Sequence, residues 1–336
     1  MKIVIDAFGG DYSPSEIIEG AVLSVKKHPE TEIILVGDEQ KINDYFAEKK
    51  LSKERIEIFH APDVISNEES PTAAIKRPGT SLGEAFNILK SNADVEALIS
   101  CGSTGAILTG GFLKIGRIKG VSRPALAPFL PTRKGTNVLL IDCGANADCK
   151  PINLCHFAVM GSLYFSEING VEKPKVALLS NGTEEHKGNE LTKAAFQMLK
   201  DLPINFVGNI EARDIVSGDV DVVVADGFSG NIALKSIEGA VKLALGELKS
   251  AIKKGFWAKF GALFMKGAFK QVKKTMDYSK YGGSPFLGTK KLIIKSHGDS
   301  KRETVLYAVE QAIKCAKLEI NSKIEEAVAG LELTEA

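Results

Sequence analysis

The sequence predicts an α/β protein of three layers, a mostly parallel, twisted sheet with helices on both faces. Short β-branched strands alternate with longer helical stretches from one end of the 336 residues to the other. An apolar content of 44% is sufficient for a large core. No repeat, low-complexity tract or flexible linker divides the chain, so we expect residues 1–336 to form one α/β unit.

The elements can be assigned in order from apolar spacing. Period-2 or continuous apolar runs indicate strands at 2–6, 32–36, 55–60 and 95–101. Helical spacing indicates helices at 15–27, 106–115, 194–200 and 230–254. Pro124, Pro128 and Pro131 fix a rigid extended segment, which we interpret as a crossover and not as a domain boundary.

Four strands run directly into small polar loops that contain glycine and precede a helix. The four stretches are 97–105, 138–146, 176–184 and 222–231. Ligands of open α/β sheets bind beyond the carboxyl ends of the strands, and backbone N–H groups at helix N-termini attract anions. We therefore expect the four loops to gather at one sheet edge and to form one pocket for a phosphate-like group.

These loops supply the candidate phosphate and substrate ligands. Glycine allows close backbone approach, and hydroxyl and amide side chains can donate to an anion. The candidates are Gly102, Ser103, Thr104, Gly105, Asp142, Asn146, Gly182, Thr183, Asn189 and Ser229. The same residue types also cap helices and stabilise turns when no ligand is present, so both interpretations stay open.

The loop at 181–190 is the densest in charged groups. Lys187 is the cation that we expect to neutralise a bound phosphate or a developing oxyanion, and Asn231 is able to touch the same anion. His186 is either a general base or an idle surface residue. Cys101 is either a thiolate nucleophile at a helix N-terminus or a buried cysteine at the end of a strand.

Composition and missing motifs exclude several function classes. A net charge of +1 gives no general case for nucleic-acid binding. Five cysteines without a Cys-x-x-Cys motif, no signal peptide and no long uncharged apolar run favour a reduced, cytoplasmic protein. Cys143, Cys149 and Cys155 do not have a standard zinc spacing, so no metal is expected. The phosphate-loop, dinucleotide, nucleophile-elbow and H-E-x-x-H motifs are absent.

The segment 248–280 departs from the rest as a basic amphipathic helical arm. Residues 248–276 contain eight lysines and no acidic residue. On a helix, aromatic and aliphatic residues share one arc with lysines beside it, although glycines and off-arc residues favour a broken helix or a hairpin. Such a segment suits an anionic membrane or an acidic protein, and a core-facing helix is the alternative. The expected contact residues are Lys254, Phe256, Trp257, Phe260, Leu263, Phe264 and Lys266.

Many short motifs, in order along the chain, give the sequence a family resemblance. It resembles the bacterial phosphate acyltransferases of phospholipid synthesis, the acyl-ACP:phosphate transacylases, over residues 1–320. Cys143 stands where relatives commonly carry an apolar residue, which argues against a catalytic thiol there. The motifs are D-A-F-G-G-D at 6–11, S-T-G-A at 103–106, G-R-I-K-G at 116–120, R-P-A-L-A-P at 123–128, D-C-G-A-N at 142–146, G-T-E-E at 182–185, K-G-N-E at 187–190, G-N-I-E-A-R-D at 208–214, D-G-F-S-G-N at 226–231 and Y-G-G at 281–283.

The resemblance implies a reaction and a setting. Inorganic phosphate would attack the thioester of a long-chain acyl-ACP, and acyl phosphate and free ACP would result. No cofactor would be required, because phosphate dianion is already a nucleophile, and Lys187 and Asn231 would be the catalytic residues. A homodimer with a fold like phosphotransacetylases and isopropylmalate dehydrogenases is implied. The resemblance also implies that the protein attaches peripherally to the cytoplasmic membrane and that the arm contacts ACP or anionic lipid. It further implies a downstream glycerol-phosphate acyltransferase that uses acyl phosphate.

Three other functions compete with this one. A short-chain phosphotransacetylase acting on acyl-CoA would share the fold and the phosphate chemistry. A decarboxylating dehydrogenase would require a nicotinamide-binding signature, which the sequence lacks. A non-catalytic scaffold would bind membranes through residues 248–276 and show no turnover that depends on phosphate.

Overall fold

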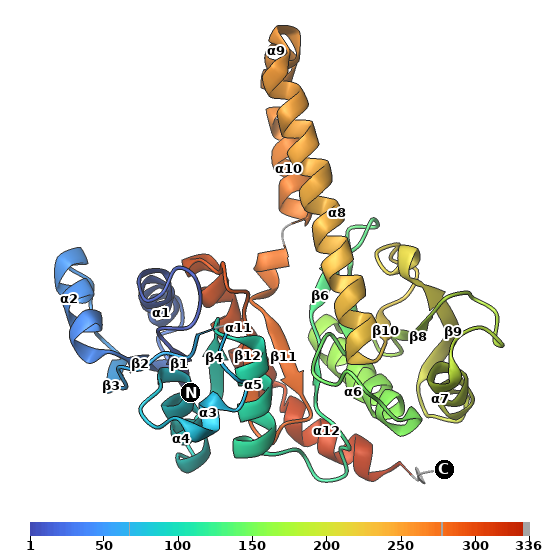
Figure 1. Cartoon of the computed structure of the whole chain (residues 1–336), viewed down its shortest axis with the longest axis horizontal. Coiled ribbons are helices and arrows are strands. Elements are labelled where there is room, and N and C mark those ends of the chain that lie inside the picture. The colour runs from blue at the N-terminus through green and yellow to red at the C-terminus, as the bar shows by residue number, and fades with distance from the viewer. Residues whose placement is uncertain (67, 277, 332–336) are drawn as a thin grey trace.

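The computed structural model describes residues 1–66, 68–276 and 278–331, and the α/β prediction is confirmed. The strands form two sheets, one at each side of the molecule (Figure 1). The first sheet has seven strands, and only β11 runs antiparallel to its two neighbours, β12 and β5. Its strands are, in sheet order, β3 (Ile56–His60), β2 (Glu32–Gly37), β1 (Lys2–Asp6), β4 (Val95–Ser100), β12 (Leu292–Lys295), β11 (Ser284–Leu287) and β5 (Ala125–Leu126).

The second sheet has five strands, of which only the edge strand β6 is antiparallel to its neighbour. The order is β6 (Phe129–Pro131), β7 (Asn137–Ile141), β10 (Val222–Val224), β8 (Lys175–Ser180) and β9 (Asn205–Glu211). The proline segment carries β5 into the first sheet and β6 into the second, so the chain crosses from one sheet to the other there. The chain returns to the first sheet only at β11 and β12, about 160 residues after the end of β5.

Helices cover both faces of each sheet because successive strand residues point to opposite sides. On the first sheet, Ile3 and Ile5 pack with α1 (Ser15–Lys27) and α11 (Arg302–Lys317), whereas Val4 packs with α4 (Ser81–Ser91) on the other face. On the second, one face packs on α6 (Pro151–Asn169) and α7 (Glu190–Lys200), and the opposite face on the start of α8 (Gly227–Lys254). The remaining helices are α2 (Glu39–Lys49), α3 (Ala73–Lys76), α5 (Thr104–Gly110), the π-helical turn η1 (Gly111–Ile115), the 3₁₀ turns η2 (Ala212–Asp214) and η3 (Tyr278–Tyr281), α9 (Phe256–Phe264), α10 (Lys266–Met276) and α12 (Ile320–Ala329).

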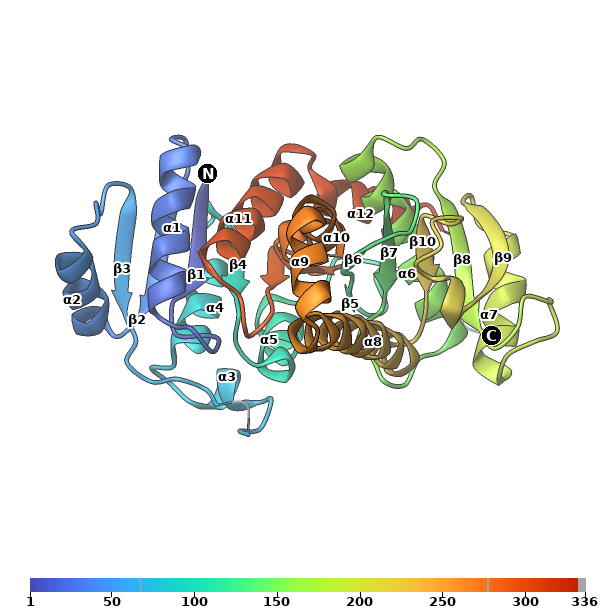
Figure 2. The same ribbon diagram turned by 90° about the horizontal axis from the view of Figure 1, so that it is seen from above.

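The arm is a helical hairpin that projects from the body, as the sequence allowed (Figure 1). Helix α8 leads outward, α9 lies at the tip and α10 returns. The path breaks at Gly255, whose extended backbone (φ −105°, ψ 131°) ends α8. Figure 2, which looks down on the arm, shows α8, α9 and α10 over the middle of the body, between β1–β4 and β7–β10. No helix in the described chain is long and apolar enough to cross a membrane.

Candidate active site

A cleft of about 750 Å³ lies between the two sheets, beside the base of the arm. Each half of the molecule contributes a wall. The first sheet supplies Thr104 after β4 and the residues that follow β12, and the second half supplies one face of α8. The crossover between the sheets lines the cleft with Leu126, Pro128, Phe129 and Leu130.

One face of α8 lines the cleft over four turns. The helix begins at Asp226, whose carboxylate accepts hydrogen bonds from the N–H groups of Phe228 (3.1 Å) and Ser229 (2.9 Å). Gly230 brings this first turn against the end of β7, because a Cβ there would lie 1.9 Å from the carbonyl oxygen of Asp142. At helical spacing, the cleft-facing residues are Asn231, Leu234, Lys235, Glu238, Val241, Lys242 and Leu245.

The cleft therefore has two chemically different surfaces. Leu234, Val241 and Leu245 of α8 join the apolar residues of the crossover and form a strip suited to a hydrocarbon chain. Facing the same space are charged and hydroxyl groups from the end of β12 onward, namely Lys295, Ser296, His297, Asp299, Ser300, Lys301 and Glu303. A ligand that is apolar over most of its length and polar at one end matches this arrangement.

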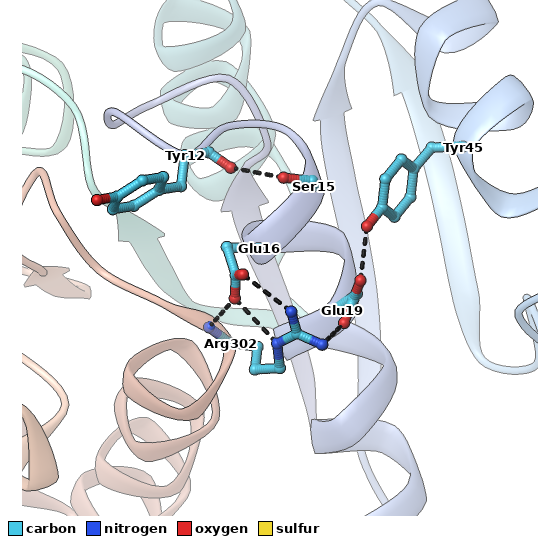
Figure 3. A network of polar contacts seen from close by, with 6 residues as sticks. All are labelled: Tyr12, Ser15, Glu16, Glu19, Tyr45 and Arg302. Atoms are coloured by element: carbon cyan, nitrogen blue, oxygen red, sulfur yellow. Dashed lines mark hydrogen bonds and ion pairs between the residues drawn. The ribbon is translucent and has the colours of Figure 1, made fainter. Parts of the chain in front are cut away.

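The loop after β12 is held in place by an ion-pair network between α1 and α11 (Figure 3). The Arg302 guanidinium donates to both oxygens of Glu16, with Nε at 3.0 Å and Nη2 at 2.9 Å, and its Nη1 is bound to Glu19. The Arg302 side chain holds the pKa of Glu16 below its usual value. Tyr45 donates to Glu19 at 2.6 Å. The network therefore fixes the first turn of α11 directly behind Lys301.

The turn after β7 is organised by Asp142, which is fully buried. Its oxygens accept hydrogen bonds from the backbone N–H groups of Leu126 (2.9 Å), Ala145 (3.1 Å) and Asn146 (2.8 Å) and from the Asn146 side chain (2.8 Å). Burial raises the pKa of Asp142 to about 6, and these donors oppose the rise. Asp142 and Asn146 thus position the crossover and the start of α8 and do not line the cleft.

A similar hydrogen-bonded arrangement around a buried aspartate joins the ends of β1 and β4 in the first sheet. Asp6, buried at the end of β1, accepts a hydrogen bond from the Ser100 hydroxyl at 2.7 Å. Ser100 in turn accepts one from the Gly102 N–H at 3.0 Å. Gly9 must be glycine here, since a Cβ would lie 2.7 Å from the Gly102 nitrogen. This chain of contacts sets the loop that presents Thr104 to the cleft.

The four glycine loops come from two sheets, so the expectation of a single sheet edge was wrong. Loop 97–105 follows β4 in the first sheet, and the other three follow β7, β8 and β10 in the second. Sequence spacing could not reveal the division, because strand pairing joins residues far apart in the chain. Of the predicted site residues, Thr104 and Asn231 line the cleft from opposite sides. Gly102, Ser103 and Gly105 flank Thr104, and Ser229 lies in the first turn of α8.

The loop after β8 lies apart from the cleft. Lys187 is half-buried and packs over Gly182, where a Cβ would lie 2.8 Å from its Cγ. Asn189 caps α7 by accepting a hydrogen bond from the Thr192 N–H at 2.9 Å. Gly188 between them has φ +109°, a conformation that favours glycine. Thr183 is exposed on the same loop, and none of these residues lines the cleft.

The chain is similar to proteins of one family over almost its whole length. The family model described as "Fatty acid synthesis protein" matches residues 1–323. Relatives from Clostridium novyi and Nitratiruptor, both named phosphate acyltransferase, are each 47% identical over 326 and 325 residues. Each alignment covers 97% of this chain, and 98% and 97% of the respective relative. The chain belongs to the phosphate acyltransferase family.

Solved structures similar to this phosphate acyltransferase support the fold. The EutD phosphotransacetylase from Staphylococcus aureus aligns with a TM-score of 0.59 at 17% identity, covering 95% of this chain and 94% of the other. A phosphotransacetylase from Streptococcus pyogenes aligns with a TM-score of 0.57 at 18% identity, covering 98% and 94%. The predicted likeness to phosphotransacetylases is thus confirmed at the level of the fold.

The end of β12 and the residues after it form a part of the cleft that was not expected from the sequence. Lys295, Ser296 and Ser300 line it, although no role was assigned to them. The sequence does contain a pattern that could have indicated them, because residues 292–298 form an apolar strand followed by a polar loop with glycine, like the four stretches above. Ser284–Leu287 lies in a glycine-rich stretch but forms strand β11 beside β12.

The cysteines of the acyltransferase are unsuited to nucleophilic catalysis. Cys101 is buried, and burial raises the pKa of its thiol to about 11. Burial also raises the pKa of Cys143, which lines the cleft. The alternative that Cys101 is a buried cysteine at a strand end is therefore the one that the structure favours.

Thiol alkylation is consequently expected to leave activity intact. At pH 8, a thiol of pKa about 11 is only about one part in a thousand thiolate, and thiolate is the reactive form. After an hour with iodoacetamide at pH 8, we expect phosphate-dependent turnover equal to that of untreated protein. Rapid inactivation that substrate prevents would contradict this assignment.

Proposed function

We propose that this phosphate acyltransferase moves a long-chain acyl group from acyl-ACP to inorganic phosphate in the cleft, giving acyl phosphate for phospholipid synthesis. The observation that carries the proposal is the pairing of an apolar strip with a polar surface of lysine, hydroxyl and carboxylate groups in one cavity. The acyl chain would lie along Leu234, Val241 and Leu245, and the thioester would face the polar groups near Asn231.

The chemistry requires no covalent enzyme intermediate. A phosphate oxygen attacks the thioester carbon, the carbonyl oxygen becomes an oxyanion, and the C–S bond then breaks. The acyl–oxygen bond of acyl phosphate forms, and the carrier thiolate leaves and takes up a proton. Holding both reactants in one cleft makes the reaction effectively unimolecular, which lowers the activation free energy by several kcal/mol. The high pKa of Cys101 supports direct attack by phosphate over a transient acyl-enzyme.

Asn231 and Lys187 are the proposed catalytic residues. Asn231 is exposed in the cleft at the first turn of α8, where its amide can donate to the oxyanion. Lys187 would supply positive charge to the phosphate when the loop at 181–189 moves toward the cleft. The neighbouring glycines, Gly182 and Gly188, are consistent with such a movement.

The arm is proposed to bind an anionic membrane surface and the acidic carrier protein. At its tip Trp257 is 80% exposed and Phe264 78%, so the described side chains do not form a core-facing helix. Phe260 and Phe264 form an edge-to-face pair with centroids 5.3 Å apart. Lys254 and Lys266 are exposed beside them. The side chains of Phe256 and Leu263, which were also expected to make contact, lie outside the described part of the structure.

Replacing Phe260 by aspartate is expected to weaken membrane binding. A carboxylate at the tip removes apolar area and is repelled by anionic lipid. We expect the Phe260→Asp variant to pellet with vesicles of phosphatidylglycerol and phosphatidylcholine at least about tenfold less, with soluble turnover largely intact. Leu113→Asp is the matched control, because Leu113 is 59% exposed on the body and away from the arm. Equal sedimentation of wild type and both variants would reject attachment through this face.

The remaining proposals concern assembly and location. Exposed leucines on α8, with Leu243 at 67% and Leu248 at 43%, support a homodimer formed along the arm. A mass of one chain in light scattering would contradict it. The protein would then work in the cytoplasm at the inner membrane surface and deliver acyl phosphate to a glycerol-phosphate acyltransferase.

The test of the proposed function is a donor comparison. Purified protein is supplied with phosphate and either palmitoyl-ACP or acetyl-CoA, and acyl phosphate is trapped with hydroxylamine as the hydroxamate. Product from palmitoyl-ACP alone is the expected result. Product from acetyl-CoA alone would establish short-chain phosphotransacetylase activity, and none from either donor would favour a scaffold.

A further inference from the structure

Lys295 is a cation that lines the cleft. It is the last residue of β12, at the carboxyl end of a strand inside the first sheet, and its side chain is half-buried. Its ammonium group donates to the carbonyl oxygen of Ser296. No carboxylate in the described chain forms an ion pair with it. A partly desolvated charge is unfavourable without a counter-charge, so this position is prepared for an anion.

A second cation approaches the same space from the opposite wall. Lys235 lies on α8, one turn after Asn231, and lines the cleft that Lys295 also lines. Burial lowers the pKa of Lys295, and repulsion by Lys235 adds to this effect, while Cys101, Asp11 and Asp299 oppose it. Glu238 offsets part of the Lys235 charge from 3.5 Å away. Two ammonium groups that repel each other across a cavity become mutually favourable once an anion lies between them.

Hydroxyl groups complete the polar surroundings of Lys295. Ser296 and Ser300 line the cleft close to it, and Thr104 lines the cleft at the start of α5. Ser296 already donates to the carbonyl of Gly282 and Ser300 to that of His297, so their oxygens are held in fixed positions. Such oxygens accept hydrogen bonds from a protonated phosphate, while the lysines donate to its unprotonated oxygens.

We propose that Lys295 and Lys235 bind the inorganic phosphate substrate between them and hold it for attack on the thioester. The identity of the anion rests on the proposed function, whereas the site itself rests on the two facing cations. The site joins the two halves of the cleft, because Lys295 belongs to the first sheet and Lys235 to the helix that follows the second. Phosphate would then lie within reach of Asn231, which is one turn from Lys235.

The test measures phosphate binding and turnover separately. Isothermal titration with inorganic phosphate is carried out on wild type, Lys295→Met, Lys295→Arg and Lys235→Met. Loss of one charge-assisted contact is expected to weaken phosphate binding about 10- to 100-fold in each methionine variant. The KM for phosphate should rise by a similar factor while the KM for palmitoyl-ACP stays within about twofold. Lys295→Arg, which keeps the charge, should recover part of the affinity. Lys290→Met, an exposed lysine outside the cleft, is the matched control.

Thermal unfolding separates this role from a structural one. Phosphate should raise the Tm of wild type and have little effect on that of Lys295→Met. Without phosphate, Lys295→Met should be at least as stable as wild type, because an unpaired charge has been removed. Should that variant fail to fold, Lys235→Met carries the test alone, since it changes an exposed side chain.

The outcomes also separate the site from the proposed function. Wild-type phosphate affinity in both methionine variants would overturn the site, even if turnover is present. If phosphate binding depends on both lysines but palmitoyl-ACP is not consumed, the result supports the anion site and contradicts the proposed function.

Discussion

Replacing Asn231 by alanine is expected to lower kcat by about 10²- to 10³-fold, with little change in the KM for either substrate. The amide lies in the cleft on the first turn of α8, where Gly230 presses the helix against the Asp142 turn. A donor held in this way interacts with the oxyanion more strongly than with the planar thioester, so its loss acts on the transition state.

The measurement is steady-state release of free ACP at saturating phosphate. Ser236→Ala is the matched control, because Ser236 is exposed on α8 but does not line the cleft. If Asn231→Ala keeps wild-type kcat, the amide does not stabilise the oxyanion. A rise in KM at constant kcat would instead make it a binding residue.

Replacing Lys187 by alanine is expected to abolish measurable turnover, a loss of at least about 100-fold, while the fold and the oligomeric state of the wild type persist. Its side chain is half-buried over Gly182 and does not line the cleft, so this prediction requires the loop after β8 to move when substrate binds. The loss should appear in kcat/KM for phosphate, because the ammonium would act on the phosphate group.

Lys193→Ala is the control for Lys187→Ala, since Lys193 is an exposed lysine on the neighbouring α7. Circular dichroism and light scattering show whether each variant keeps the fold and the molecular mass of the wild type in solution. Full activity of Lys187→Ala would remove this residue from the mechanism. The phosphate charge would then have to come from within the cleft, where Lys295 and Lys235 already lie.

Local structure could be predicted closely because local sequence determines it. The helix expected at 15–27 has those bounds in the structure, and the expected strands agree to within a residue. The hairpin arm was also indicated by glycine placement, and α8 does end at Gly255. Amphipathic spacing and breaking residues act over one or two turns, so a single sequence is sufficient for them.

The arrangement of the site depended on long-range pairing, which a single sequence does not specify. Asp142 and Asn146 were candidate ligands by residue type, yet their side chains bind each other and the backbone of the crossover. Lys295 reaches the cleft only because β12 inserts beside β4 after the second sheet is complete. Thr104 and Asn231 were expected in loops at strand ends, whereas they lie in the first turns of α5 and α8, on opposite walls of one cleft.

The most direct test of the central claim is phosphate-dependent loss of palmitoyl-ACP, with acyl phosphate trapped as the hydroxamate. Hydroxamate should appear only when both palmitoyl-ACP and inorganic phosphate are present, and its amount should equal that of ACP released. Folded protein that releases ACP at the same rate without phosphate, or forms no hydroxamate with it, would contradict direct acyl transfer to phosphate.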